Sequence, residues 1–363
     1  MIAVGPIAVK DVSGADAWIP EPATPAQLAA RIRALFRLDV MERIAERRKA
    51  VTALYGDRAP TIEPLNSPAT VLYVGDASPR FMSLVHVMED VDAEVVAAFS
   101  SYSAFDYLHE RSFDAVVLNA DGKRDMAFTI SSAMRRNARL YHTPILLLTG
   151  DEDAEAADEA FARGVSDILT GSTDDLGMRE RVLTLAAERR RRRDAKALLE
   201  ACRDPRTLEI DTGLFHSGFV TSHIQDLLNV METGEISFAI LALQADLPDG
   251  IERPDDTSAE KARRQFAAML RHLLRAEDAA ARLNASTFLA VLPFTESDGV
   301  DCVAARVSAI AECTAFESED PLQPFRLSVI SRTVIPQPGE TAEALMERAV
   351  RALQTRTPFA RQA

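Results

Sequence analysis

The length, composition and charge of the chain limit the classes of protein to consider. A chain of 363 residues normally folds as two or three domains, each large enough to bury a core. Hydrophobic residues make up 47% and charged residues 26%, which is ordinary for a globular chain and excludes a fibrous or disordered class. The formal net charge of -14 argues against a general nucleic-acid binder, because phosphate contacts need a basic surface, but it allows a local basic pocket that binds a small anion.

Cysteine usage and hydropathy bear on the compartment. Cys202, Cys302 and Cys313 are too few and too scattered for a disulfide framework or a zinc site, so we interpret them as buried or incidental thiols in a reducing cytoplasm. The apolar start, MIAVGPIAVK, is too short for a signal or membrane segment, and no later run approaches the ~20 residues of a transmembrane helix. We therefore expect a cytoplasmic protein without membrane insertion.

The first predicted element is a long amphipathic helix over residues 24–54. Thr24 and Pro25 supply its cap and its first helical residue. Residues 56–69 are rich in proline and turn formers, which indicates a linker.

Short apolar runs then alternate regularly with segments of helical length. This order predicts a doubly wound parallel sheet of the flavodoxin-like (CheY-like) α/β class. The expected strands are 71–75, 94–98, 114–118, 144–149 and 166–169, and the expected helices are 79–90, 101–111, 124–137 and 153–163.

A second long helix is predicted over residues 177–203, and it carries five consecutive arginines, 189–193. Such a run could bind nucleic acid or a membrane surface. Because acidic residues flank it within a helix, we favour a solvated helix face.

In the last part of the chain, 204–363, strands and helices no longer alternate regularly. This pattern predicts an α/β domain with a mixed, largely antiparallel sheet. Its expected elements are a strand at 237–244, a helix at 258–275, a hairpin of 280–284 and 288–293, a helix at 297–313, a strand at 325–331 and a helix at 341–356.

Residues at the strand ends of the middle segment, 70–190, carry a chemical pattern. The first strand ends in VLYVGDAS with Asp76, the third in VVLNADG with Asn119, and Thr149 ends the fourth. In the fifth strand segment, GVSDILTGS, Gly171 stands where receiver domains usually have a lysine. The segment resembles a receiver domain, in which the third strand ends in a phosphoryl-accepting aspartate. Because the amide of Asn119 cannot form an acyl phosphate, the resemblance implies a pseudo-receiver.

The N-terminal stretch GADAWIPEPATPAQLAARIRALFR is similar to the last strand and helix of a second receiver, with Glu21-Pro22 where lysine-proline is usual. Only about the last third of such a domain is present. We interpret residues 1–55 as a partial or truncated first receiver with its connecting helix, the alternative being a genuine short cap. In either case we expect the helix to pack on its neighbour.

The whole order resembles the PleD-type response regulators, in which two receivers precede a GGDEF domain. IDTGLFHSGF is similar to the opening motif of the GGDEF domain, and LNASTFLAVLP to its hairpin. The resemblance implies a partial first receiver at 1–55, a linker at 56–69, a pseudo-receiver at 70–190, a helical stalk at 177–203 and a degenerate GGDEF domain at 204–363. In this family the domain condenses two GTP molecules into cyclic di-GMP and binds that product at a separate inhibitory site.

The catalytic half departs from the family pattern. Condensation requires acids that hold metal ions and glycines that let the nucleotide approach. The degenerate hairpin reads Asn284, Ala285, Ser286, Thr287 and Phe288, and Leu243, Gln244, His216 and Thr357 stand at other positions where the family has metal, guanine or phosphate contacts. The resemblance therefore implies no catalytic residue, no metal site, no cofactor and no enzyme activity.

The inhibitory half keeps the family's spacing. Arg275 and Asp278 form an RxxD motif that five residues, 279–283, separate from the hairpin turn at Asn284, and Arg306 follows on the next helix. An arginine can donate to the O6/N7 edge of guanine, and an aspartate can accept from N1 and N2. A surface pair is the alternative, since helices often carry arginine and aspartate three apart. We expect these three residues to bind cyclic di-GMP.

These features predict a catalytically inactive cyclic di-GMP effector that recruits protein partners in signalling and cell-cycle control. A homodimer in the cytoplasm, recruited to a cell pole, is the accompanying expectation. The second strand of the pseudo-receiver opens with Glu94 and carries no arginine, so a ligand-bridged contact between two effector domains is favoured over locking by the receiver. The alternatives are a ligand-independent dimeric scaffold and a residual diguanylate cyclase.

Overall fold

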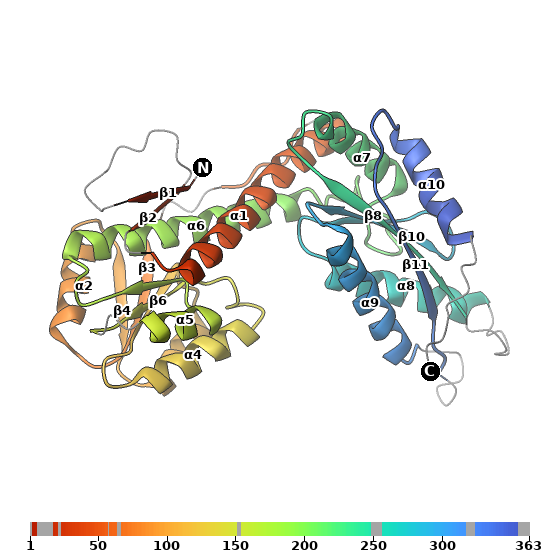
Figure 1. The fold of residues 1–363 in the computed structure, drawn as a ribbon. Coiled ribbons are helices and arrows are strands. Elements are labelled where there is room, and N and C mark those ends of the chain that lie inside the picture. Colours follow the sequence, from red (N-terminus) through yellow and green to blue (C-terminus); the bar gives the residue numbers. More distant parts are fainter. Residues whose placement is uncertain are drawn as a thin grey trace. The chain divides into compact units, whose positions relative to one another are not determined.

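The computed structural model describes residues 2–5, 17–20, 23–56, 58–63, 67–150, 154–247, 256–316 and 324–354 (Figure 1). The chain forms two compact units, the first from residues 1–39 and 63–194 and the second from residues 40–62 and 195–363. Two of the three divisions between the units, at residues 39/40 and 194/195, fall inside long helices, α1 (Pro25–Thr52) and α6 (Asp175–Ala201). The helix α6 supplies side chains to the cores of both units, whereas the core residues of α1 belong to the second unit.

The first unit contains a five-stranded parallel sheet in the order β4-β3-β5-β6-β7, which confirms the predicted flavodoxin-like topology. Every strand and intervening helix of this sheet lies within one residue of its predicted bounds. The strands are β3 (Thr70–Val74), β4 (Glu94–Ala98), β5 (Ala115–Asn119), β6 (Ile145–Leu148) and β7 (Asp167–Leu169), and the helices are α2 (Pro79–Glu89), α3 (Ser101–Glu110), α4 (Arg124–Arg136) and α5 (Ala154–Ala162).

Both faces of this parallel sheet are covered by helices. Along β3, Val71 and Tyr73 pack in the cluster that includes α2 and α6, whereas Leu72 and Val74 pack in the cluster that includes α3, α4 and Ala160 of α5. Successive side chains of a strand point to opposite faces, so a strand buried on both sides consists almost wholly of apolar residues. This is why the strand positions were predictable from short apolar runs.

The N-terminal segment contributes two short parallel strands, β1 (Ile2–Gly5) and β2 (Ala17–Pro20), and then α1. Thr24 Oγ1 accepts a hydrogen bond from the Gln27 amide at 3.1 Å, which confirms the predicted helix start. Gln27 Nε2 donates to Asp167 Oδ1 at 2.8 Å, and Arg31 forms a two-pronged ion pair with Glu188. The first half of α1 therefore packs on neighbouring elements of the first unit, as expected.

The second unit contains a four-stranded sheet in the order β11-β8-β10-β9, whose ladders are all antiparallel. A parallel bridge joins Phe215 to Ala281, so the predicted mixed, largely antiparallel sheet is confirmed. The elements are α7 (Ser217–Met231), β8 (Phe238–Asp246), α8 (Asp256–Leu273), β9 (Ala279–Arg282), β10 (Thr287–Pro293), α9 (Ser297–Cys313), β11 (Ser328–Val334) and α10 (Ala342–Gln354).

Two elements of the second unit differ from the sequence predictions. The helix α7 was not predicted, although its Phe219, Val220, Ile224 and Leu227 form a buried apolar stripe at helical spacing. The strand β11 begins three residues later than expected, because the apolar residues before it form a short bridge, Phe316 to Phe325, instead of joining the sheet. Exposed and half-buried residues dominate β11, so its hydrophobic pattern is weak.

The sheet of the second unit is also covered on both faces. One face packs against α7, α10 and the second halves of α1 and α6. The other face packs against α8 and α9. The hairpin of β9 and β10 and the residues between α8 and β9 are thereby held on a rigid scaffold.

The run of arginines on α6 is not a solvated face, so that interpretation was wrong. Of residues 189–193 only Arg191 is exposed. Arg190 donates two hydrogen bonds to Asp114 Oδ2, at 2.7 and 3.0 Å, and others to the carbonyls of Ser67 and Pro68. A helix that packs against a sheet along its length leaves only a narrow stripe for solvent, and five consecutive residues cannot all lie on that stripe.

The cysteines are free thiols; Cys202 is buried, and Cys302 and Cys313 are exposed. Within the described ranges, no helix has the length and apolar character needed to cross a membrane.

Candidate functional site

The turn that carries the RxxD motif lies between the end of α8 and the start of β9. The side chain of Arg275 is exposed, whereas Asp278 is turned inward and is 7% exposed. Asp278 Oδ2 accepts a hydrogen bond from the Arg275 backbone amide at 2.7 Å. Its other oxygen, Oδ1, is buried and has no hydrogen-bond partner among the described residues. The two predicted residues are therefore neighbours on one turn, with the arginine facing solvent and the acid facing the core.

The buried side chain of Arg48, on α1, holds this turn from inside the second unit. Its Nη1 donates to the carbonyl of Ala276 at 2.9 Å, and its Nη2 to the carbonyls of Glu277 and Asp278 at 2.6 and 3.1 Å. The guanidinium also lies over the ring of Phe215, 5.4 Å from its centroid. One arginine thus satisfies three consecutive carbonyls of the motif.

Sequence analysis did not identify Arg48 as part of the site. One signal was present, because Arg48 continues the apolar stripe of Met41, Ile44 and Val51 on α1, where a charged residue is out of place. The partner of such a residue lies more than two hundred positions away and is not visible in the local pattern.

Burial perturbs the acid–base properties of this turn. Loss of solvation, followed by the charge of Glu277, raises the pKa of Asp278 to about 7. Loss of solvation lowers the pKa of Arg48 to about 10, although nearby acidic groups oppose that change. A buried carboxyl group with an unsatisfied oxygen and a strongly raised pKa is typical of a functional site.

Arg306, on α9, reaches the same region of the second unit. Its exposed guanidinium donates from Nη2 to the carbonyl of Leu273 at 2.7 Å. Leu273 is the last residue of α8, two positions before Arg275. The structure therefore places Arg306 beside the chain segment that carries the motif.

The hairpin turn between β9 and β10 is closed on itself. Asn284 Oδ1 accepts hydrogen bonds from the amides of Ser286 and Thr287, at 3.1 and 2.9 Å. Arg282 donates to the carbonyls of Asn284 and Ala285, both at 2.9 Å. It also forms a two-pronged ion pair with Glu260 on α8, at 2.6 and 2.7 Å. The side chains of Asn284 and Arg282 therefore hold the shape of the turn, to which Ala285 contributes its backbone carbonyl.

The strand residues next to this turn offer little to a metal ion. Leu243 is fully buried, and Gln244 lies opposite Thr287 and donates to Asp246 Oδ2 at 2.6 Å. Phe288 packs in the core against Phe266, with ring centroids 5.0 Å apart. Magnesium is usually bound through carboxylates, and no group of three acidic, histidine or cysteine residues suited to a metal occurs in the described part of the chain. Leu243, Gln244 and Phe288 therefore offer no carboxylate to a metal ion.

His216 has a structural partner at each ring nitrogen. Its Nδ1 accepts from the Phe219 amide at 2.9 Å and caps α7, and its Nε2 lies 3.0 Å from the carbonyl of Arg206. Because Nδ1 accepts, the ring proton belongs on Nε2, which donates to that carbonyl. Thr357 lies outside the described residues.

A second polar cluster lies at the carboxyl ends of β3 and β5 in the first unit. Asn119 is 5% exposed; its Nδ2 donates to Tyr73 Oη at 3.1 Å, and its Oδ1 accepts from the Asp121 amide at 3.1 Å. Tyr73 Oη in turn donates to the carbonyl of Asp76, whose carboxylate pairs with Lys123 at 2.7 Å. The amide of Asn119 is thus used both as a donor and as an acceptor.

Replacing Asn119 with aspartate is expected to destabilise the protein by about 1–3 kcal/mol at neutral pH. The change removes the donor to Tyr73 and places a buried negative charge near Asp76 and Asp121. Urea unfolding should show this loss, whereas the exposed Asn137→Asp control, whose oxygen still accepts from two backbone amides, should behave like the wild type. Equal stability of Asn119→Asp and the wild type would show that the amide donor has no such role.

Comparison with known proteins shows which protein family part of the chain matches. Residues 256–358 match the family described as "Diguanylate cyclase, GGDEF domain". The GGDEF match therefore lies within the second unit, and the first unit contains the flavodoxin-like sheet. The chain is similar to response regulators that carry a GGDEF domain.

Individual proteins and solved structures are also similar to the chain or to parts of it. The chain is 22% identical over 342 residues to the response regulator PleD of Caulobacter vibrioides, and the alignment covers 93% of this chain and 74% of PleD. Solved structures similar to parts of the chain include the chemotaxis response regulator CheY4 of Vibrio cholerae, with 23% identity over 33% of this chain and 99% of that chain and a TM-score of 0.31. Another is the GGDEF domain of DgcB from Caulobacter crescentus in complex with c-di-GMP, with 18% identity, coverage of 42% and 89%, and a TM-score of 0.37.

Proposed function

We propose that this chain is a catalytically inactive cyclic di-GMP effector of the response-regulator class. It binds cyclic di-GMP through Arg275, Asp278 and Arg306 and recruits protein partners in signalling and cell-cycle control. The observation that carries the proposal is the RxxD turn, in which an exposed arginine adjoins a buried acid with one unsatisfied oxygen. As a catalytically inactive effector of this kind, the chain would resemble the degenerate family member PopA.

The chemistry of the turn suits a guanine base. The exposed guanidinium of Arg275 can donate two parallel hydrogen bonds to the O6/N7 edge, and Arg306 adds a second cation beside it. Asp278 Oδ1 lacks a donor, and the N1–H and N2–H groups of guanine are donors. Binding requires the side chain of Asp278 to turn outward, which replaces a costly buried acid with a hydrogen-bonded carboxylate.

The hairpin supports the absence of cyclase activity. Arg282 and Glu260 occupy the edge of the turn, and Ser286 and Thr287 provide hydroxyl groups where metal ligands would be needed. A site without carboxylates at these positions does not hold the triphosphate through metal ions. The GGDEF domain then acts as a binding module.

Two arrangements of the ligand site are possible: arginines of a receiver could complete it, or the ligand could bridge two GGDEF domains. The second strand of the pseudo-receiver favours the bridged arrangement. Glu94 opens β4 and pairs with Arg111 at 2.6 Å, so this edge presents a neutralised pair and not a free arginine. A cyclic di-GMP molecule has two guanines, and each can engage the motif of one chain. We accordingly propose a homodimer in which the ligand bridges two GGDEF domains.

Titration of the full chain with cyclic di-GMP tests the binding proposal. We expect calorimetry to show binding by the wild type and roughly 10- to 100-fold weaker binding by Arg275→Ala, the effect of losing one bidentate base contact of about 1–3 kcal/mol. Arg326→Ala is the matched control, because Arg326 is an exposed arginine of the same unit outside the motif. No heat of binding from the wild type would rule the proposal out.

Two other functions make different predictions. A ligand-independent dimeric scaffold would capture the same partners in a pull-down with and without cyclic di-GMP. A residual diguanylate cyclase would form cyclic di-GMP from GTP with magnesium or manganese. We expect partner capture to depend on the ligand and product formation to be absent.

A further inference from the structure

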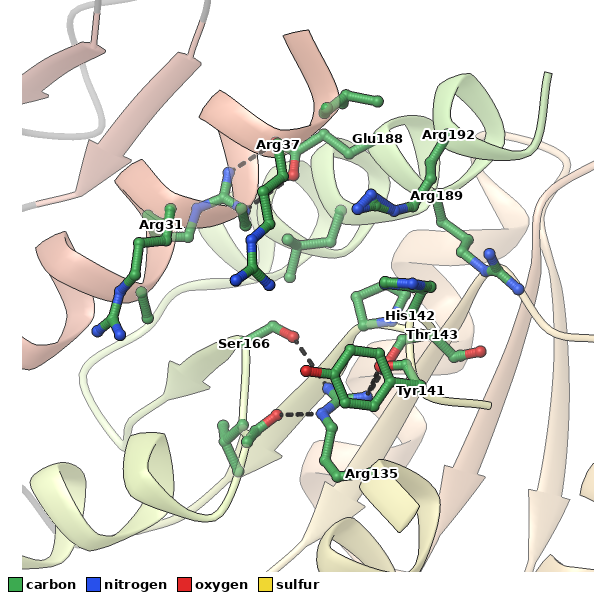
Figure 2. A pocket seen from close by; sticks show the side chains of 18 of the residues that line it. Arg31, Arg37, Arg135, Tyr141, His142, Thr143, Ser166, Glu188, Arg189 and Arg192 are labelled. Carbon is green, nitrogen blue, oxygen red and sulfur yellow. Dashed lines mark hydrogen bonds and ion pairs between the residues drawn. The ribbon is translucent and has the colours of Figure 1, made fainter. Parts of the chain in front are cut away.

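A cavity of ≈ 430 Å³ lies wholly within the first unit (Figure 2). Its walls come from the first half of α1, the segment from the end of α4 to Pro144, the α5–β7 loop and α6. Six arginines line it, whereas the lining contains one carboxylate, Glu188. The six are Arg31, Arg33, Arg37, Arg135, Arg189 and Arg192.

The positive charges of this cavity are not balanced by its acidic residue. Glu188 is taken up by the two-pronged pair with Arg31 at 2.6 and 2.9 Å. The guanidinium of Arg135 donates to the carbonyls of Tyr141, Thr143 and Gly164, which carry no net charge. Within the described ranges, neither Arg37 nor Arg135 nor Arg189 forms an ion pair with a carboxylate. An excess of guanidinium groups therefore lines this open cavity.

The charges of the arginines add to the effect of burial on nearby groups. Loss of solvation, and then the charges of Arg192, Arg189 and other arginines, lower the pKa of His142 to about 3, so its imidazole is neutral. Burial and the neighbouring charges of Arg193 and Arg192 also lower the pKa of Arg189. Gathering like charges in this way destabilises the unit unless an anion offsets them. In a chain with a net charge of -14, the cluster is a marked local exception.

We propose that this cavity binds a compact polyanion with linked phosphate groups, such as a pyrophosphate or triphosphate moiety. Planar guanidinium groups donate in pairs to phosphate oxygens, and several of them match the several charges of a phosphate chain. Arg37 from α1 and Arg192 from α6 extend into the cavity above His142 and Tyr141 (Figure 2). The volume lies in the range of small-molecule pockets, which excludes a nucleic-acid duplex as the occupant.

The site is separate from the RxxD turn and does not rest on the proposed function. All its lining residues belong to the first unit, whereas Arg275, Asp278 and Arg306 belong to the second. A variant of the cavity should leave the affinity for cyclic di-GMP unchanged, and Arg275→Ala should leave phosphate binding unchanged.

Calorimetric titration of the full chain with inorganic tripolyphosphate tests the proposal. We expect binding that weakens as salt is raised, because the contacts are ionic. Arg37→Ala should weaken binding roughly tenfold, and the double variant with Arg192→Ala should abolish it. Arg136→Ala is the matched control, since this exposed arginine adjoins Arg135 but does not line the cavity. Arg37 is itself exposed, so its single variant is expected to fold.

Titrations with other anions show whether the site binds a nucleoside polyphosphate or the phosphate chain alone. Tighter binding of ATP or GTP than of tripolyphosphate would assign the site to nucleoside polyphosphates, and equal binding would assign it to the phosphate chain alone. Citrate, a carboxylate polyanion, should bind more weakly than tripolyphosphate. The proposal is overturned if tripolyphosphate does not bind the wild type, if Arg37→Ala and Arg136→Ala bind it equally, or if citrate binds as tightly.

Discussion

Replacing Arg48 with methionine is expected to lower the free energy of unfolding of the second unit by about 3–5 kcal/mol. Methionine keeps the apolar stem but removes the donors to the carbonyls of Ala276, Glu277 and Asp278. Each buried acceptor left without a donor costs about 1–3 kcal/mol, and part of that loss is recovered if the turn relaxes toward solvent. The contact between the guanidinium and Phe215 is lost as well.

The neighbouring Arg47 provides the matched control. Its guanidinium lies 3.5 Å from Asp226, and its side chain is 37% exposed, so Arg47→Ala should cost at most about 1 kcal/mol. Urea unfolding of both variants measures the difference. We also expect Arg48→Met to weaken cyclic di-GMP binding, because a loosened turn no longer presents Arg275 in one position. Equal losses of stability in the two variants would contradict a specific role of Arg48.

The pH dependence of stability should report the buried carboxyl group of Asp278. Its pKa rises from 3.8 in the unfolded chain to about 7 in the folded protein. Between these two pH values, the folded state keeps a proton on Asp278 that the unfolded state has lost. The contribution of this group is therefore fully favourable below about pH 4 and is lost as the pH rises toward 7. A shift of this size corresponds to on the order of 4 kcal/mol.

Asp278→Asn should remove that dependence. An asparagine oxygen can still accept from the Arg275 amide, but the side chain has no charge to bury. We expect the variant and the wild type to be about equally stable near pH 4, and the variant to be more stable at pH 8. Unfolding curves at several pH values measure this difference, and parallel curves for the two proteins would show that Asp278 does not titrate in this range.

The same substitution separates stability from binding. If guanine donates to the carboxylate of Asp278, cyclic di-GMP binds the ionised form, and its affinity should rise between pH 6 and pH 8. Asp278→Asn should be more stable yet bind more weakly. A residue that costs stability where it stands is expected at a site kept for binding.

The architecture was predictable from sequence wherever a hydrophobic pattern was strong. The strands buried on both faces, such as β3 and β5, are short apolar runs, and their bounds agree within one residue. The weakly patterned edge strand β11 was misplaced by three residues, because half-exposed residues carry little periodic signal. The arginine run was misjudged because burial on α6 depends on the sheet it packs against, which local sequence does not reveal.

By itself, the sequence determined the order of elements in the parallel sheet, the position of Asn119 at a strand end and the spacing of Arg275, Asp278 and the hairpin. These features depend on local pattern and separation along the chain, which the fold preserves. Only the tertiary structure decided that Asp278 faces inward, that Arg48 holds its turn and that arginines from α1, α4 and α6 line one cavity. Burial and charge compensation depend on residues brought together from distant positions, and so they cannot be read from any one segment.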